Sequence, residues 1–152
     1  MAEQVGKMMR HVSREMAMKM AFARLLGGDS TYDEAVAVSY EGTPSFEKIM
    51  QRRNDDDIAF AKMLVEGIEA HMTEIDEIIN DYLKDWKTTT LPKVELTILR
   101  IAVYELTYTP DVPQGAIINE AVELAKTYCD ENKHSYINGV LSTYVKFING
   151  NN

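Results

Sequence analysis

Hydrophobic residues recur at helical spacing along nearly the whole chain. Near the N-terminus, apolar side chains three or four positions apart predict a helix over about residues 8–26. One face of it carries Val5, Met9, Val12, Met16, Met20 and Ala23. A glycine pair at 27–28 ends this helix, because glycine adopts the left-handed stop conformation easily. A second helix is predicted over about 31–42, and residues 44–54 have only a weak pattern.

The middle of the chain predicts two further helices, up to about residue 83. The first has a buried stripe of residues three and four positions apart, namely Ile58, Ala61, Val65, Ile68 and Met72. Thr73 is a candidate cap for the second. Trp86 and three consecutive threonines follow, and they mark a connection. The only subdomain boundary is therefore predicted near residues 84–91.

The C-terminal part begins with the most apolar helix, over about 92–108. Its hydrophobic residues go nearly all the way round, which predicts a central, buried helix. A helix over about 114–129 is expected to bury Ile118, Ala121, Val122, Ala125 and Tyr128. The last helix starts at Asn132 or Ser135. No strand-like alternation and no fixed repeat interrupts this pattern, so the prediction is an all-α fold of about seven helices.

Length and composition narrow the class of protein. At 152 residues the chain predicts a single domain. Its one cysteine excludes an internal disulfide and a zinc site made of several cysteines. No apolar run is long enough to cross a membrane, and no secretion signal is evident, so we expect a cytoplasmic protein.

Charge is unevenly distributed along this acidic chain, whose formal net charge is −8. Residues 1–26 hold five basic and two acidic residues and so carry +3, which leaves −11 on the rest. An acidic body repels nucleic acid, but salt screens its field beyond about 8–10 Å, so a basic segment can still bind RNA locally.

Catalytic patterns are missing. The histidines His11, His71 and His134 lie far apart in sequence, and Cys129 has no nearby cluster of basic residues that would lower its pKa. The acidic run 55–57 lacks the spacing of a calcium loop and fits the start of a helix. We therefore predict no catalytic residues, no metal, no cofactor and no enzymatic activity.

Three blocks in the C-terminal half resemble the NusB family, at the family's order and spacing. They are LRIAVYEL at 99–106, INEAVELAK at 118–126 and INGVL at 137–141. The resemblance implies two small helical bundles packed together in one NusB-like domain over 1–152, with subdomains of about 1–84 and 85–152. It also implies a transcription antitermination factor.

The resemblance further implies specific partners. Family members bind the boxA element of ribosomal RNA leaders as single-stranded RNA, together with the ribosomal protein NusE. The pair then joins RNA polymerase and other Nus factors. The oligomeric state stays open between a monomer and a homodimer.

The family's N-terminal helix carries an arginine-rich pattern, which matches this chain at Arg10, His11 and Arg14. Cations on one helix face can contact successive phosphates, and Lys7 lies on the same face. His11 occupies a usual arginine position and, with an ordinary pKa of about 6.5, is mostly neutral at pH 7. We therefore expect weaker or more pH-dependent RNA contact than in a typical member. A simply solvated basic face is the alternative.

Further RNA contacts are expected in the second half. Tyr82, Tyr128 and Tyr136 match aromatic positions of the family near the RNA, although Tyr82 and Tyr128 also fit the core. Lys133 and His134 lie at the start of the last helix, where free N–H groups favour a phosphate.

Protein contacts are expected at other positions. Phe22, at the basic edge of the first helix, is a candidate anchor for NusE. Glu95 and Arg100 are charges within the most apolar helix, and the family's partner-facing surface suggests ion pairs with NusE. An internal pair or a solvated edge fits them equally well. A protein-only module without useful RNA affinity, and self-association through the first helix, remain alternative functions.

Overall fold

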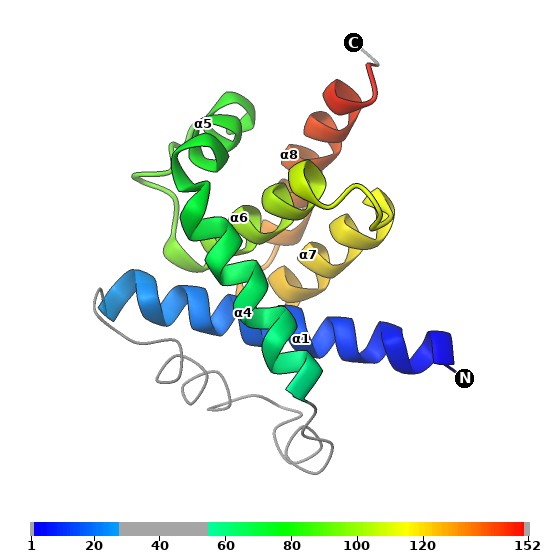
Figure 1. The fold of residues 1–152 in the computed structure, drawn as a ribbon. Helices are drawn as coiled ribbons and strands as arrows, with labels where there is room; N and C mark the ends of the chain where they lie inside the picture. The colour runs from blue at the N-terminus through cyan, green and yellow to red at the C-terminus, as the bar shows by residue number, and fades with distance from the viewer. Residues whose placement is uncertain (1, 28–54, 151–152) are drawn as a thin grey trace. The chain divides into compact units, whose positions relative to one another are not determined.

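The structure is a computed structural model that describes the backbone of residues 2–27 and 55–150 and the side chains of 11–25 and 58–150. The described residues form helices and no strands (Figure 1), so the all-α prediction is confirmed. The helices are α1 (Ala2–Gly27), α4 (Asp55–Ala70), α5 (Met72–Tyr82), α6 (Lys93–Tyr108), α7 (Gln114–Tyr128) and α8 (Lys133–Ile148). The helix predicted over 31–42 lies outside the described residues.

The chain divides into two compact units, 1–66 and 67–152. The division falls within the continuous helix α4, whereas the sequence pattern placed the boundary near 84–91. That connection instead lies inside the second unit, because α5 packs against both α6 and α8. Alternation of helix and turn marks where elements end, but it does not show which elements pack together.

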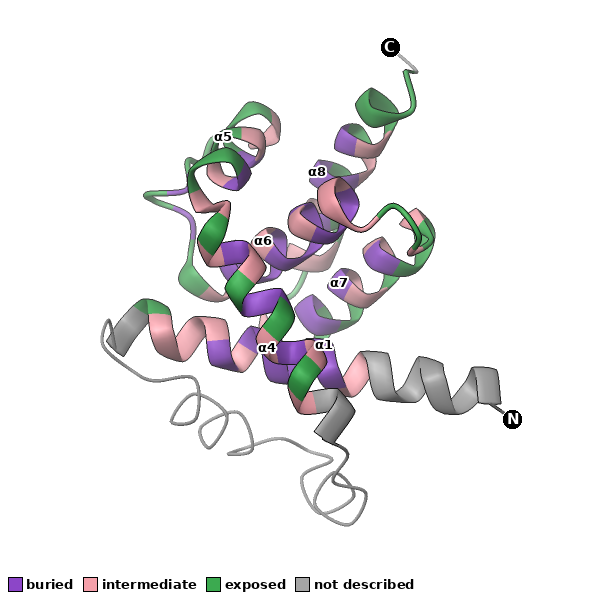
Figure 2. Ribbon diagram, in the orientation of Figure 1, coloured by how far each residue is buried: buried purple, intermediate pink, exposed green. Residues whose placement is uncertain are grey.

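The second unit is organised around α6, which packs against α5, α7 and α8 (Figure 1). Pro92 and Pro113 precede α6 and α7 directly, in keeping with proline's fixed φ at helix starts. Most of α6 is buried (Figure 2), as its apolar circumference predicts.

The buried face of α7 differs from the prediction by about one position. Ile117 and Leu124 are buried together with Ala121 and Ala125. Ile118, Val122 and Tyr128 are only half-buried. Apolar residues occur on several sides of α7, so its periodicity alone does not show which of them face α6 and α8.

In the first unit, α1 is buried nearly all round in its middle. Ser13, Arg14 and Glu15 are buried, as are Met16 and Met20. The guanidinium of Arg14 lies over the ring of Phe60 on α4, with 5.7 Å between its carbon and the ring centroid. The prediction that Arg14 shares a solvent-exposed face with His11 is therefore wrong. A planar, weakly hydrated guanidinium stacks on aromatic rings, so this cation tolerates burial.

Gly67 permits a close approach within the second unit. A Cβ atom at this position would lie 2.3 Å from Cζ and the hydroxyl oxygen of Tyr104. The Tyr104 ring cannot move away freely, because it packs against Tyr108 at a centroid distance of 5.3 Å. Tyr108 in turn stacks on His71 and donates a hydrogen bond to Glu74.

We expect Gly67→Ala to destabilise the protein relative to a matched glycine substitution. Gly139, on the exposed side of α8, has nothing within 4 Å of an added Cβ. Both substitutions gain about 1 kcal/mol of helix propensity, but only Gly67→Ala overpacks, at a cost of about 1–3 kcal/mol. In urea unfolding, Gly67→Ala should thus be about 1–3 kcal/mol less stable than Gly139→Ala. The gap should close when Tyr104 is also replaced by alanine, and equal stability without that replacement would contradict the close approach.

Candidate RNA and protein interface

Four residues of the first helix are predicted to bind RNA, and the structure describes the side chains of two of them, His11 and Arg14. Lys7 and Arg10 lie on α1, but their side chains are outside the described part of the chain. The His11 side chain is 42% exposed, and its Nε2 atom lies 3.8 Å from Oε2 of Glu15 one turn later. Arg14 is 3% exposed, so a phosphate could reach it only if its surroundings moved. Contact of these four residues with RNA stays a prediction.

Tyr136 connects the start of α8 to the segment between α5 and α6. Its hydroxyl donates a hydrogen bond to the carbonyl oxygen of Lys84 at 3.0 Å and accepts one from the Lys84 amide at 3.2 Å. Burial raises the pKa of this phenol, although the backbone hydrogen bond to Lys84 acts in the opposite direction. The hydroxyl is thus engaged within the chain, and only the half-buried ring is left to contact a ligand.

Lys133 lies between an acidic and an aromatic side chain. Its Nζ atom is 3.8 Å from Oε2 of Glu95 and 5.3 Å from the ring centroid of Trp86. Trp86 is 39% exposed. In the sequence, Trp86 predicts no more than a connection. The signal for a further role is a lone tryptophan between Lys84 and Lys87, in an otherwise acidic chain.

Glu95 is buried, with 4% of its surface exposed. Its Oε2 atom has no hydrogen-bond partner in the described part of the chain. Burial raises the pKa of this carboxyl, Lys133 lowers it, and Asp130 raises it further. Of the alternatives for Glu95, the structure shows the internal pair. The nearby Cys129 thiol has its pKa raised to about 11, mainly by burial, so it is a poor nucleophile at neutral pH.

Arg100 also forms an internal pair. Its Nε and Nη2 atoms donate hydrogen bonds to the two carboxylate oxygens of Asp76 at 2.9 and 2.8 Å. The side chains are 11% and 24% exposed. This two-pronged bond joins α6 to α5, so the guanidinium fork is already occupied before any partner binds.

The remaining predicted residues are half-buried. The Tyr82 ring packs against Tyr144 and Phe147 at centroid distances of 5.5 and 6.4 Å, which favours the core role that was the alternative for it. Tyr128 lies at the end of α7 and His134 in the first turn of α8. Phe22 is half-buried on α1. Contact of Tyr82, Tyr128 and His134 with RNA, and of Phe22 with NusE, stays a prediction.

The described residues contain no group of three or more His, Cys, Asp or Glu side chains that could hold a metal ion. Within the same ranges, every helix is too short or too polar to span a membrane.

Comparison with known proteins shows the family of this chain. The model of the NusB family matches residues 11–146. The chain belongs to the NusB family. Transcription antitermination protein NusB of Clostridium botulinum (strain Kyoto / Type A2) is 39% identical over 145 residues, which cover 91% of this chain and all of that protein. NusB is a transcription antitermination family and not an enzyme family, so the prediction of a protein without enzymatic activity is confirmed.

Solved NusB structures share the fold. NusB of T. maritima superposes with a TM-score of 0.74 at 27% identity, covering 90% of each chain. A chain from a crystal structure of antitermination factors NusB and NusE in complex with dsRNA superposes with a TM-score of 0.73 at 29% identity. That match covers 91% of this chain and 97% of the other.

We expect Asp76→Ala to lower the free energy of unfolding by about 2–3 kcal/mol, because it leaves the largely buried Arg100 guanidinium without its carboxylate. The matched control is Glu123→Ala, which removes the half-exposed pair with Lys126 at 3.7 Å. That change should cost less than about 1 kcal/mol. Chemical denaturation of both variants measures the difference. Similar losses would show that the α5–α6 pair contributes no more than a surface pair.

Glu95 should make stability depend on pH. Because its pKa is raised in the folded state, the folded protein retains a proton that the unfolded chain loses above a pH of about 4.3. The free energy of unfolding should therefore fall as pH rises through the window between the ordinary and the raised pKa. Glu95→Gln should remove this fall. The exposed Glu131→Gln serves as the control for loss of one carboxylate, and a Glu95→Gln profile parallel to the wild type would contradict the assignment.

Proposed function

We propose that this protein is an RNA-binding antitermination factor that binds a boxA-type ribosomal RNA leader together with NusE. It acts in the cytoplasm, in a complex of RNA polymerase with other Nus factors. The observation that carries the proposal is the family match over residues 11–146, combined with the likeness to a NusB chain seen with NusE and dsRNA.

The described residues support two RNA-contacting regions, one in each unit. In the first unit, α1 carries Lys7, Arg10 and the exposed His11 side chain. In the second unit, Lys133 and His134 lie in the first turn of α8, just before Tyr136. Cations with an aromatic ring are the chemistry by which single-stranded RNA is held.

The charge of the chain supports a basic protein partner. A net charge of −8 favours attraction of a basic ribosomal protein and faster association with it. Arg100 and Glu95 contribute to NusE binding indirectly, because their internal pairs fix the position of α6, the helix that carries both of them. We therefore assign them a supporting role in the NusE surface and leave direct contact to Phe22 and neighbouring residues.

The decisive measurement is fluorescence anisotropy of a labelled boxA-type RNA and a scrambled RNA, at two salt concentrations, with and without NusE. Binding should prefer boxA, tighten with NusE and weaken as salt rises. If NusE binds but boxA affinity stays at the scrambled level, the protein is a protein-only interaction module instead.

Charge reversal on α1 tests the basic helix. Lys7→Glu with Arg10→Glu should weaken RNA binding at least about tenfold and reduce the salt slope by about two, with folding and NusE affinity unchanged. Arg14 is left intact because a glutamate at that buried position would destabilise the fold. Lys126→Glu with Lys146→Glu, at exposed positions of α7 and α8, makes the same change in net charge. If this control weakens binding equally, α1 is not the contact.

A further inference from the structure

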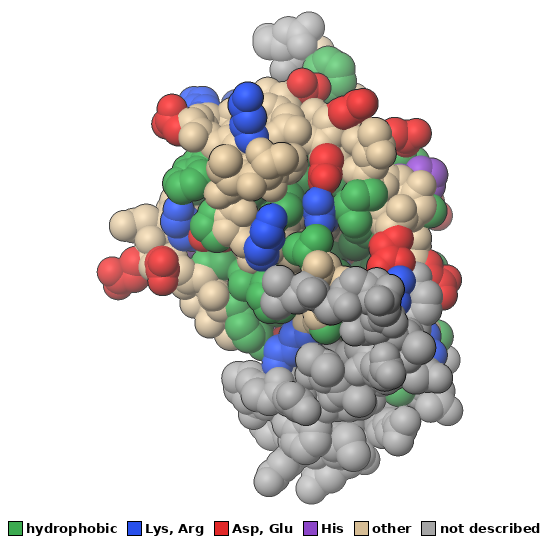
Figure 3. All heavy atoms as spheres, turned by 90° about the vertical axis from the view of Figure 1, so that its left-hand side faces the viewer, with side chains coloured by type: hydrophobic (Ala, Val, Ile, Leu, Met, Phe, Trp, Pro, Cys, Tyr) green, Lys and Arg blue, Asp and Glu red, His purple; other side chains and the backbone are tan. Residues whose placement is uncertain are grey.

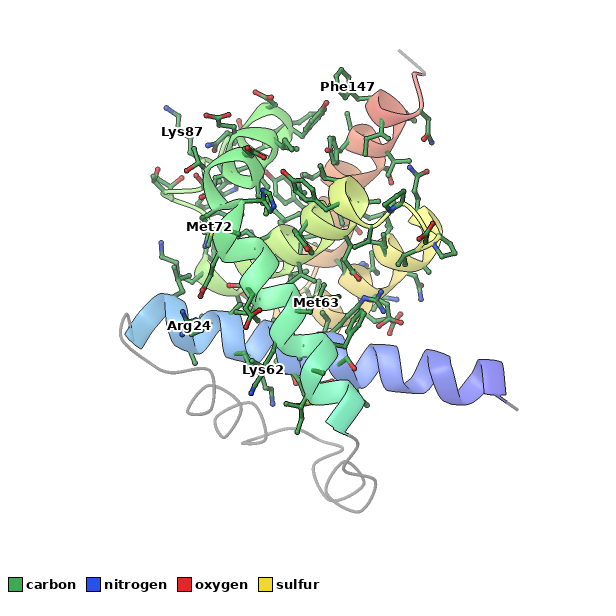
Figure 4. The ribbon with its side chains drawn as sticks, in the orientation of Figure 1. Arg24, Lys62, Met63, Met72, Lys87 and Phe147 are labelled. Carbon is green, nitrogen blue, oxygen red and sulfur yellow. The ribbon has the colours of Figure 1, made fainter. Side chains whose placement is uncertain are left out.

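The connection between α5 and α6 is basic, although the chain as a whole is acidic. Residues 83–92 contain Lys84 and Lys87 against one acid, Asp85, and Lys93 follows as the first residue of α6. The connection projects on the left of Figure 1, the side that faces the viewer in Figure 3. On that face, lysine and arginine side chains lie between hydrophobic ones. Lys87 is labelled at the outer edge of the connection in Figure 4.

Hydrogen bonds hold this connection in one conformation. The amide of Thr88 donates to Oδ1 of Asn80 at 2.9 Å, and Nδ2 of Asn80 donates to the Thr88 hydroxyl at 3.2 Å. The carbonyl oxygen of Lys87 accepts from the amides of Thr90 and Leu91 at 2.9 and 2.8 Å. Leu91 itself is buried. A residue within this segment is therefore presented on a pre-ordered support, which lowers the entropy lost when a ligand binds.

Trp86 is the aromatic residue of this connection. Asp85 before it has a left-handed backbone with φ of 67°, a conformation that aspartate tolerates better than most residues. The indole keeps 39% of its surface exposed, with the Lys133 ammonium 5.3 Å from the ring centroid. The same ammonium lies 3.8 Å from Oε2 of the buried Glu95 carboxylate.

We infer that Trp86 is a stacking platform for one unpaired RNA base and that Lys133 and the lysines of the connection contact its flanking phosphates. This inference rests on the proposed function and adds a residue to it. An exposed aromatic ring with the Lys133 ammonium beside it, and with Lys84 and Lys87 close by in sequence, matches the two needs of a single-stranded nucleic acid. These are a flat surface for the base and positive charge for the backbone. A basic segment fits a polyanion better than it fits a basic protein partner.

The chain contains a single tryptophan, which makes the test direct. Tryptophan fluorescence of the full-length protein is followed while an unlabelled boxA-type single-stranded RNA is added. A base stacked on the indole should quench the emission with the same midpoint that anisotropy gives for binding. A double-stranded RNA of the same length, whose bases are already stacked, should quench far less.

Substitutions then measure the contribution of the ring. Trp86→Leu should weaken RNA binding about 5- to 100-fold, and Trp86→Phe, which keeps an aromatic face, should weaken it less. The matched control is Phe147→Leu, at a 63% exposed ring near the end of α8 (Figure 4), which should leave affinity within about twofold. Lys133→Gln should weaken binding and reduce the salt slope by about one. Thermal unfolding of each variant shows that the fold is retained.

The outcomes separate this inference from the proposed function. RNA binding by anisotropy without quenching, and with Trp86→Leu at wild-type affinity, would overturn the role of Trp86 and leave the antitermination proposal standing. Loss of NusE affinity in Trp86→Leu with RNA affinity unchanged would also overturn it and would make Trp86 a protein contact. Absence of RNA binding by the wild type, alone and with NusE, would defeat both.

Discussion

The burial of α6 is the constraint on which the second unit depends. This helix is apolar on nearly every side, so no arrangement that leaves one of its faces in water is favourable. Three helices, α5, α7 and α8, cover it. Each of them needs only one apolar face to do so, and their other faces are free to carry the charges and polar groups that a binding protein presents.

Charges on a buried helix have to be satisfied close by. Arg100 donates two hydrogen bonds to Asp76 of α5, and Oε2 of Glu95 lies 3.8 Å from the Lys133 ammonium of α8. These contacts join α6 to two of the helices that cover it. Leaving either charge without its partner would be costly in a low-dielectric interior. The pairs therefore favour one relative placement of α5, α6 and α8, beyond what apolar contact alone would specify.

That placement also builds the surface proposed to meet RNA. The start of α8 lies against the α5–α6 connection because Tyr136 bonds to the backbone of Lys84 on both its amide and its carbonyl. Lys133, one helical turn earlier, then extends over Trp86. Residues about fifty positions apart in sequence thus form one cluster of aromatic and basic side chains. The carboxylate of Glu95, on α6, lies 3.8 Å from the lysine ammonium of this cluster.

The sequence by itself determined the helices, their approximate ends and the family. The signals that determined them are local, because each depends only on residues that are close in sequence. They are the helical periodicity, the prolines before α6 and α7, and the three family blocks. The tertiary structure decided what depends on distant neighbours. The burial of Arg14, the internal pairs of Arg100 and Glu95, the face that α7 buries and the exposure of Trp86 all follow from which helices meet. The sequence around a charged or aromatic residue is the same whether another helix covers its side chain or water does. Only the packing of the helices could therefore show which of these side chains are buried, paired or exposed.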